Sequence, residues 1–198
     1  MATDIKALLA NLLAFYDFRD KTIISVGAGG GQLAEYGRTA GKIIAVDNDP
    51  LAMEKLRDNL KLSGLEGKFT TVLEDFGQTA MRGDAVLFEF CLHEMKDSEA
   101  AVKHARSLAP DVIIFDHWPG SEWSYIAAEE AKVAASWQAL MHFPMKKEQK
   151  HDTVQVFKDY EELYEKVKGQ GETSIARIAE YKGKTNIVIP MSYGLVLI

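Results

Sequence analysis

Cysteine is nearly absent from this 198-residue sequence, because Cys91 is the only one. A single cysteine is typical of proteins kept in a reducing compartment, and residues 1–20 also lack the basic start, apolar core and small-residue cleavage site of a secretory signal. No apolar run approaches the roughly 20 residues that a membrane-spanning helix needs. We therefore expect a cytoplasmic protein with no membrane partner.

Basic residues are in the minority, with 23 lysines and arginines against 29 acidic residues and a net charge of −6. Proteins that bind phosphate backbones need clustered positive charge, and no long basic run is present, which disfavours nucleic acid as a partner. Internal repeats and low-complexity tracts are missing as well. Hydrophobic residues at 47% and charged residues at 26% indicate one folded domain over residues 1–198.

Short β-branched and apolar runs alternate with helical patterns over the first part of the chain. Such alternation requires a parallel sheet covered by helices on both faces. Two further strand-like runs near the C-terminus are separated by a short loop and predict an antiparallel hairpin. We expect strands at 22–26, 42–46, 68–73, 85–90, 111–115, 173–181 and 187–198, and helices at 3–16, 32–39, 50–62, 98–108, 122–140 and 160–168.

Two segments fall outside this alternation. Residues 1–20 predict an amphipathic helix before the main fold, because their apolar residues recur at helical spacing. Residues 117–158 predict an insertion that forms a lid over the substrate rim of the sheet, and the charged stretch 146–150 within it predicts a solvated loop. The apolar stripe of the first helix and the covered rim are both compatible with a homodimer.

A glycine-rich loop links the first expected strand to the helix that follows it, and it contains Gly27, Gly29, Gly30 and Gly31. Glycines let the backbone turn sharply and approach a ligand closely, and a helix N-terminus offers free N–H groups to an anionic group. Asp47 ends the second strand about 20 residues later, where a carboxylate can accept hydrogen bonds from a ribose diol. Together these residues predict an adenosine-type cofactor.

The loop departs from the dinucleotide-binding fingerprint. That pattern would place its third glycine at position 32, but Gln32 stands there and the glycine falls at position 31. An NAD-dependent oxidoreductase is therefore a disfavoured alternative.

Glycines at alternate positions, followed by Asp47, resemble the first motifs of the class I S-adenosylmethionine-dependent methyltransferases, over roughly residues 22–116. The resemblance implies a Rossmann-like, doubly wound α/β fold with a mostly parallel seven-stranded sheet and a C-terminal antiparallel hairpin. It also implies S-adenosylmethionine as the cofactor. The implied contacts are Gly27, Gly29 and Gly31 for the methionine end, Asp47 and Asn48 for the ribose, and Asp75 and Phe76 for the adenine.

One position departs from the family pattern. The family usually has an acidic residue two positions before the first glycine, and this chain has Ser25. The amino group of the cofactor then needs another acceptor, and Glu89 or backbone carbonyls of the neighbouring loops could serve. The other reading is that cofactor affinity is weak or lost.

Two histidines are candidates for the chemistry. His93 follows the fourth expected strand and His117 follows the fifth, at the edge where open α/β sheets bind ligands, so either could act as a base or orient the substrate. The alternative for each is a histidine that only hydrogen-bonds within its turn. Trp118 and Trp123 flank the same rim and predict an aromatic wall for a small-molecule substrate.

A metal site is not predicted. Glu89 and Glu94 lie close to His93 in the sequence, and His117 could join them, but no tight ligand spacing such as His-x-x-x-His occurs. Cys91 is interpreted as a small buried residue rather than a nucleophile or ligand.

These observations favour a methyltransferase that moves a methyl group to a small molecule by in-line displacement, a reaction in which the protein mainly aligns the acceptor. A non-catalytic S-adenosylmethionine-binding module is the alternative, because Ser25 is unusual and no base is unambiguous. An RNA or protein methyltransferase is less favoured. Methylation of base amino groups typically uses an Asn/Asp-Pro-Pro-aromatic loop after strand four, whereas residues 89–93 read Glu-Phe-Cys-Leu-His.

Overall fold

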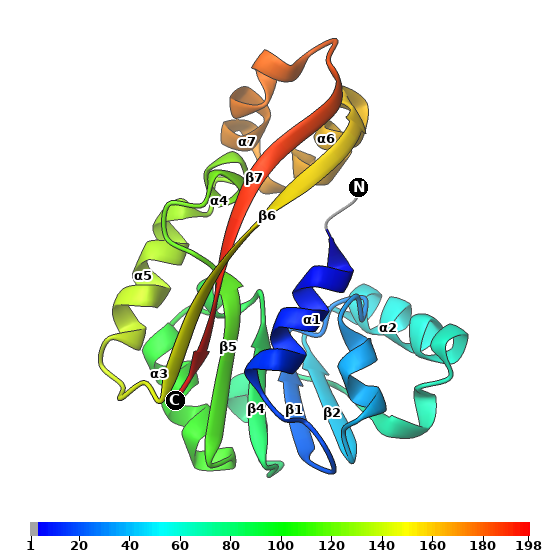
Figure 1. The fold of residues 1–198 in the computed structure, drawn as a ribbon, viewed down its shortest axis with the longest axis vertical. Coiled ribbons are helices and arrows are strands. Elements are labelled where there is room, and N and C mark those ends of the chain that lie inside the picture. Colours follow the sequence, from blue (N-terminus) through cyan, green and yellow to red (C-terminus); the bar gives the residue numbers. More distant parts are fainter. Residues whose placement is uncertain (1–3) are drawn as a thin grey trace.

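Seven strands form one sheet in the computed structural model, which describes residues 4–198 of the chain (Figure 1). Their order is β3-β2-β1-β4-β5-β7-β6, with β1 to β5 parallel and β7 antiparallel to both β5 and β6. The strands span Thr22–Val26, Lys42–Asp47, Phe69–Leu73, Ala85–Glu89, Asp111–His117, Lys147–Asp159 and Thr185–Leu197. The predicted fold class, a mostly parallel seven-stranded α/β sheet that ends antiparallel, is confirmed. The expected C-terminal hairpin with a short loop is wrong, because residues 160–184 separate the antiparallel strands β6 and β7.

Helices cover both faces of this sheet. Ile23 on β1 packs in a core cluster with α1, α4 and α6, whereas its neighbour Ile24 packs with α3 and α5 on the opposite face. The helices α1 to α7 span Ile5–Phe15, Pro50–Ser63, Ser98–Leu108, Glu122–Ile126, Glu130–Leu140, Tyr160–Val167 and Glu172–Arg177. The 3-10 turns η1 to η6 span Ala34–Arg38, Glu66–Lys68, Phe76–Gln78, Leu92–Glu94, Lys168–Gln170 and Ala179–Tyr181. Within residues 4–198, none of the helices is long and apolar enough to cross a membrane.

The central strands β1 and β4 explain where a ligand can bind. All five residues of β4 and the last four of β1 are buried, which is typical of parallel strands covered on both faces. The strand order reverses between β1 and β4, because β1 connects outward to β2 and β4 connects outward to β5. In open α/β sheets the crevice at the carboxyl ends of such a strand pair is the ligand site.

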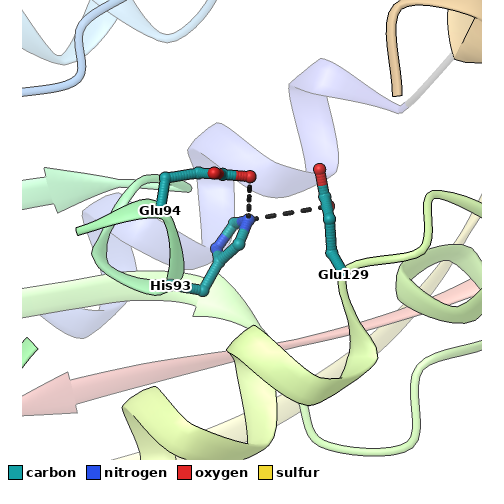
Figure 2. Close-up of side chains that lie close together, drawn as sticks. All are labelled: His93, Glu94 and Glu129. Atoms are coloured by element: carbon teal, nitrogen blue, oxygen red, sulfur yellow. Dashed lines mark ion pairs between the residues drawn. The ribbon is translucent and has the colours of Figure 1, made fainter. Parts of the chain in front are cut away.

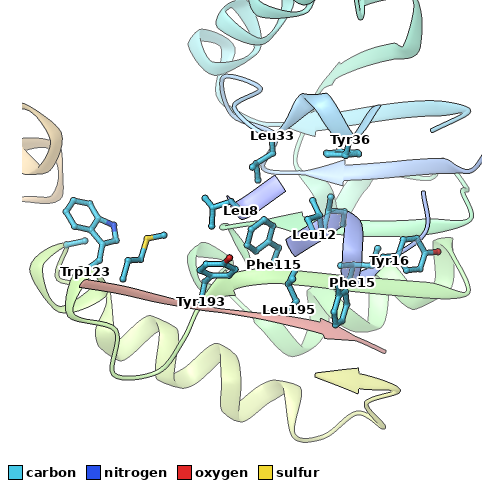
Figure 3. Close-up of a cluster of buried hydrophobic side chains, with 14 of the residues drawn as sticks. Leu8, Leu12, Phe15, Tyr16, Leu33, Tyr36, Phe115, Trp123, Tyr193 and Leu195 are labelled. Atoms are coloured by element: carbon cyan, nitrogen blue, oxygen red, sulfur yellow. The ribbon is translucent and has the colours of Figure 1, made fainter. Parts of the chain in front are cut away.

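Helix α1 lies across one face of the sheet, near β1 and β4 (Figures 1 and 3). Its buried side chains Leu8, Leu12 and Phe15 lie one turn apart and pack in the core cluster that contains Phe115 of β5. The predicted amphipathic helix is confirmed over Ile5–Phe15, and position 3 of the expected range lies outside the described residues.

Strand β6 was not predicted. Residues 147–158, which we expected in a lid, belong to β6 and pair with β7, so this half of the expected insertion is part of the sheet. Only Val156 separates the two fully buried residues of the strand, Gln155 and Phe157, and most of the others are exposed or half-buried. An edge strand with so little buried surface carries a weak hydrophobic pattern, which explains why residues 146–150 resembled a loop.

One expected strand and two expected helices also need correction. The expected strand at 173–181 is helical, because β7 pairs with β6 and the intervening residues form α6, η5, α7 and η6. The expected helix at 122–140 is split into α4 and α5 at Ala128, whose φ of 59° lies in the left-handed region and cannot continue a helix. The expected helix at 32–39 is reduced to the single 3-10 turn η1.

Candidate functional site

The glycine loop follows β1 at the point where the strand order reverses. Gly27 has a φ of 68°, and a Cβ atom there would lie 2.5 Å from Cβ of Cys91, so only glycine fits. Gly29 and Gly31 also have positive φ values, of 51° and 75°. The N–H of Gly29 donates to Oδ2 of Asp47 at 3.0 Å, which ties the loop to the end of β2.

A cavity of 260 Å³ opens on one side of this loop, between the ends of β1, β2 and β3, and we call it the β2–β3 cavity. It brings together four predicted residues, Asp47, Asn48, Asp75 and Phe76, with Gly27 at its inner end. Asp75 is exposed and begins the turn η3, where its Oδ1 accepts the N–H of Gly77 at 2.7 Å. Phe76 is 6% exposed and packs edge-on against Phe88, so it is also part of the core.

A second cavity, of 280 Å³, lies on the other side of the loop and is called the β4–β5 cavity here. Gly27 lines both cavities, so the two adjoin at the loop. The predicted residues Gly29, Glu89, His117 and Trp123 line the second one. Its wall is completed by Ile5 and Leu8 of α1 and by Gln155 and Met191 of the antiparallel strand pair.

The carboxyl group of Glu89 lies beneath the glycine loop. Its Oε1 accepts hydrogen bonds from the hydroxyl of Ser25 and, at 2.8 Å, from the hydroxyl of Tyr36. Burial raises the pKa of Glu89 to about 7, although both hydroxyl donors oppose this by stabilising the ionised form. An acidic group is therefore present beside Ser25, but β4 supplies it rather than β1.

His93 lies in the turn after β4 and is held by carboxylates. Its Nδ1 is 2.6 Å from Oδ1 of Asp116 on β5, and its Nε2 is 3.5 Å from a carboxylate oxygen of both Glu94 and Glu129 (Figure 2). Burial lowers the pKa of His93, but the carboxylates of Asp116 and Glu129 outweigh this effect and raise it to about 10. His93, Glu94 and Glu129 line a further cavity of 210 Å³, called the carboxylate cavity.

His117 ends β5 and lines both the β4–β5 cavity and the carboxylate cavity. Its side chain is buried, and within residues 4–198 its Nδ1 has no hydrogen-bond partner. Burial lowers the pKa of His117 to about 4, so the ring is neutral near pH 7. A neutral imidazole that faces a cavity can accept a hydrogen bond from a ligand.

The two predicted tryptophans are placed differently. Trp123 is buried, stacks on Phe157 and lines the β4–β5 cavity. Trp118 packs against Trp137 with the ring centroids 4.4 Å apart and lines neither the β4–β5 nor the carboxylate cavity. Cys91 donates its thiol to the carbonyl of Val26 at 3.1 Å, and burial raises the thiol pKa well above its usual value, which agrees with the interpretation of a structural residue.

Sequence reasoning missed two residues of this site. Tyr36 gave no signal, because it lies in a segment expected to be an ordinary helix. Glu129 was expected inside the long helix at 122–140, and only the break at Ala128 brings it to His93.

Comparison with known proteins gives one family match, to the family described as "Methyltransferase domain", over residues 24–115. A curated relative, the ribosomal protein L11 methyltransferase of Prochlorococcus marinus (strain MIT 9301), is 33% identical over 78 residues. That alignment covers 38% of this chain and only 26% of the relative, so the chain matches about a quarter of the relative's length.

Solved structures share the fold over nearly the whole chain. The YcgJ protein of Bacillus subtilis is similar with a TM-score of 0.73 and 13% identity, covering 97% of each chain. The magnesium protoporphyrin IX methyltransferase ChlM of Synechocystis PCC 6803, with bound SAH, has a TM-score of 0.59 and 12% identity and covers 97% of this chain and 80% of that one. At these identities the likeness shows the fold alone.

Proposed function

We propose that the chain, whose residues 24–115 match the methyltransferase-domain family, is a class I S-adenosylmethionine-dependent methyltransferase that methylates a small-molecule acceptor. The single observation that carries the proposal is the pair of cavities that adjoin at Gly27, with the carboxylate of Asp47 on one side and that of Glu89 on the other. When bound, the cofactor supplies a sulfonium methyl group as the electrophile.

The residues present fit this cofactor. Asp47 and Asn48 would hold the ribose hydroxyls, and Asp75 with Phe76 would contact the adenine in the β2–β3 cavity. Gly27 lines both cavities and has no side chain, so the backbone of the loop can contact the amino-acid end of the cofactor.

Glu89 would replace the acidic residue that the family usually has two positions before the first glycine, where this chain has Ser25. Its carboxylate would pair with the ammonium group of the methionine end, and the hydroxyls of Ser25 and Tyr36 hold it in place. Ser25 therefore supports a functional cofactor site instead of marking its loss.

His117 and Trp123 would contact the acceptor, because both line the β4–β5 cavity next to Glu89. The neutral ring of His117 can accept a hydrogen bond or a proton from the acceptor's nucleophile. His93 faces the carboxylate cavity, which shares His117 and Trp123 with the β4–β5 cavity, so it would act on the acceptor from that side. Trp118 would contribute only as support for the rim through Trp137.

Residues 117–146, which contain α4 and α5, would serve as the remaining part of the substrate lid. The proposal also includes a cytoplasmic location, supported by the single cysteine, and a homodimer through the outer face of α1, where Leu13 is exposed. Light scattering of the purified protein tests the dimer.

Titration with S-adenosylhomocysteine by calorimetry tests the cofactor assignment, with NAD as the control. Micromolar binding of the first ligand and none of the second supports the proposal. Methyl transfer to members of a small-molecule panel then tests catalysis. Binding without turnover of any acceptor would favour the non-catalytic module, and failure to bind S-adenosylhomocysteine would overturn the cofactor site.

A protein acceptor is the second candidate, because the curated relative methylates a ribosomal protein according to its name. The β4–β5 cavity argues against it, since Ile5 and Leu8 of α1 narrow the access to His117. Incubation of the enzyme with purified ribosomal proteins and labelled S-adenosylmethionine distinguishes the two candidates. Labelling of a ribosomal protein with no labelling of small molecules would replace the first proposal by the second.

A further inference from the structure

We propose that His93, Glu94 and Glu129 bind a divalent transition-metal ion, with Zn²⁺ as the best match. Each residue offers one ligand atom, and the three atoms lie within 4.8 Å of one another (Figure 2). One imidazole nitrogen and two carboxylate oxygens form a donor set that suits Zn²⁺ better than Mg²⁺ or Ca²⁺, which prefer oxygen ligands alone.

The spacing of the ligand atoms fits an ion between them. Nε2 of His93 lies 3.5 Å from Oε1 of Glu94 and 3.5 Å from Oε2 of Glu129. A charge-assisted hydrogen bond would draw such atoms to about 2.8 Å. Two ligands of a tetrahedral Zn²⁺ with bonds of about 2.1 Å lie roughly 3.4 Å apart. The three side chains therefore point at a common position without closing on one another.

The second polar atom of each proposed ligand contacts another residue of the protein, which fixes the side chain in place. Nδ1 of His93 is 2.6 Å from Asp116, Oε2 of Glu94 is 2.8 Å from Nζ of Lys132, and Oε1 of Glu129 is 2.9 Å from Nε2 of Gln170. Metal-binding histidines usually donate their second ring nitrogen to a carboxylate, which fixes the ring for the metal. With these outer atoms occupied, Nε2 of His93, Oε1 of Glu94 and Oε2 of Glu129 face one another across the proposed ion position.

The site is accessible. His93, Glu94 and Glu129 line the carboxylate cavity of 210 Å³, so a fourth position remains for water. His117, whose buried Nδ1 has no hydrogen-bond partner within residues 4–198, lines the same cavity.

The charges around His93 also favour a bound cation. Asp116, Glu94 and Glu129 bring three carboxylates around one imidazole ring, and Lys132 is the cation that pairs with Glu94. Lys166 lines the same cavity, and Glu94 is exposed whereas Asp116 and Glu129 are buried. Negative charge is costly to bury, so a divalent ion beside Asp116 and Glu129 would be stabilised by them.

Calorimetric titration of the tag-free, EDTA-treated full chain with Zn²⁺ tests the site. We expect one equivalent to bind, and we expect Glu129→Gln, which keeps the shape but removes the charge, to weaken binding by about 100-fold, with His93→Ala at least as severe. His142→Ala is the matched control, because His142 also pairs with a glutamate, Glu99, but on the exposed surface. It should bind Zn²⁺ as the wild type does.

Substitution of Co²⁺ for Zn²⁺ provides a second readout. A four-coordinate site gives intense visible absorption, and Glu129→Gln should abolish it even if the variant is otherwise well folded. Absence of Zn²⁺ binding to the wild type, or equal binding by Glu129→Gln and the wild type, would overturn the metal site. In that case His93 is a protonated imidazolium that forms ion pairs with Asp116, Glu94 and Glu129. Neither measurement involves S-adenosylmethionine, so the outcome is independent of the proposed methyl transfer.

Discussion

Affinity for S-adenosylhomocysteine should rise with pH, because the carboxyl group of Glu89 must ionise before it can pair with the ligand's ammonium group. Burial raises the pKa of Glu89 to about 7 in the free protein. A bound ammonium group favours the ionised form and lowers that pKa. Ligand binding therefore releases a proton below pH 7, and protonation of Glu89 competes with the ligand.

The magnitude follows from the ionised fraction of Glu89. With a pKa of about 7, this fraction is about 0.1 at pH 6 and about 0.9 at pH 8, so the association constant should increase roughly ninefold between them. Other buried groups of the site do not interfere, because the pKa of His117 is lowered to about 4 and that of His93 is raised to about 10. Both lie outside this window.

Calorimetry at pH 6, 7 and 8 measures the effect, and repetition in buffers of different ionisation enthalpy counts the released protons. Glu89→Gln should bind weakly at every pH and show a flat profile. Ser25→Ala removes a donor to the ionised carboxylate, so its profile should shift to higher pH. A flat profile in the wild type, or the same slope in Glu89→Gln, would refute the assignment of Glu89 to the ammonium group.

Three further predictions concern cofactor affinity, turnover and stability. Asp47→Ala should weaken S-adenosylhomocysteine binding by about 1.5 to 3 kcal/mol in calorimetry, through lost charge-assisted bonds to the ribose and a loosened Gly29; unchanged affinity would contradict the ribose contact. His117→Ala should lower turnover by about 100-fold and leave cofactor affinity unchanged, and global unfolding, detected by circular dichroism, would assign it a structural role instead. Leu12→Ala should lower the free energy of unfolding in urea by about 2 to 5 kcal/mol, because Leu12 is fully buried between α1 and the sheet; a loss below about 1 kcal/mol would mean that α1 contributes little to the core.

Patterns of neighbouring residues were enough to predict the central strands β1 and β4 and the loop between β1 and the next helical turn. The runs at β1 and β4 are buried on both faces, so most of their residues are hydrophobic and the strands can be predicted from the sequence. Gly27 and Asp47 are similar cases, because a sharp turn and a carboxylate at a strand end depend on their immediate neighbours. The helix N-cap at Asp49, which accepts the N–H of Leu51, depends on contacts over two residues.

The edge of the sheet could not be predicted in this way. Residues 147–159 are largely exposed or half-buried and polar, and they become a strand because β7 offers a hydrogen-bonding partner along its whole length. Residues 173–181, which we expected to form a strand, fold as α7 and η6 instead, because β7 is already paired with β5 on one side and β6 on the other. Strand pairing is a property of two segments, and the choice between partners is made in three dimensions.

By itself, then, the sequence determined the parallel part of the fold, the glycine loop and the position of Asp47 at a strand end, because each depends on local chemistry or on a repeated hydrophobic period. The sequence left Glu89 and backbone carbonyls as alternatives, and only the tertiary structure placed the carboxylate of Glu89 beside Ser25, since the parallel pairing of β1 and β4 brings those side chains together. Only the tertiary structure also brought Glu129 to His93. The contact between Glu129 and His93 depends on the break between α4 and α5 at Ala128 and on packing between segments far apart in the chain. Neither can be predicted from the spacing of residues in the sequence.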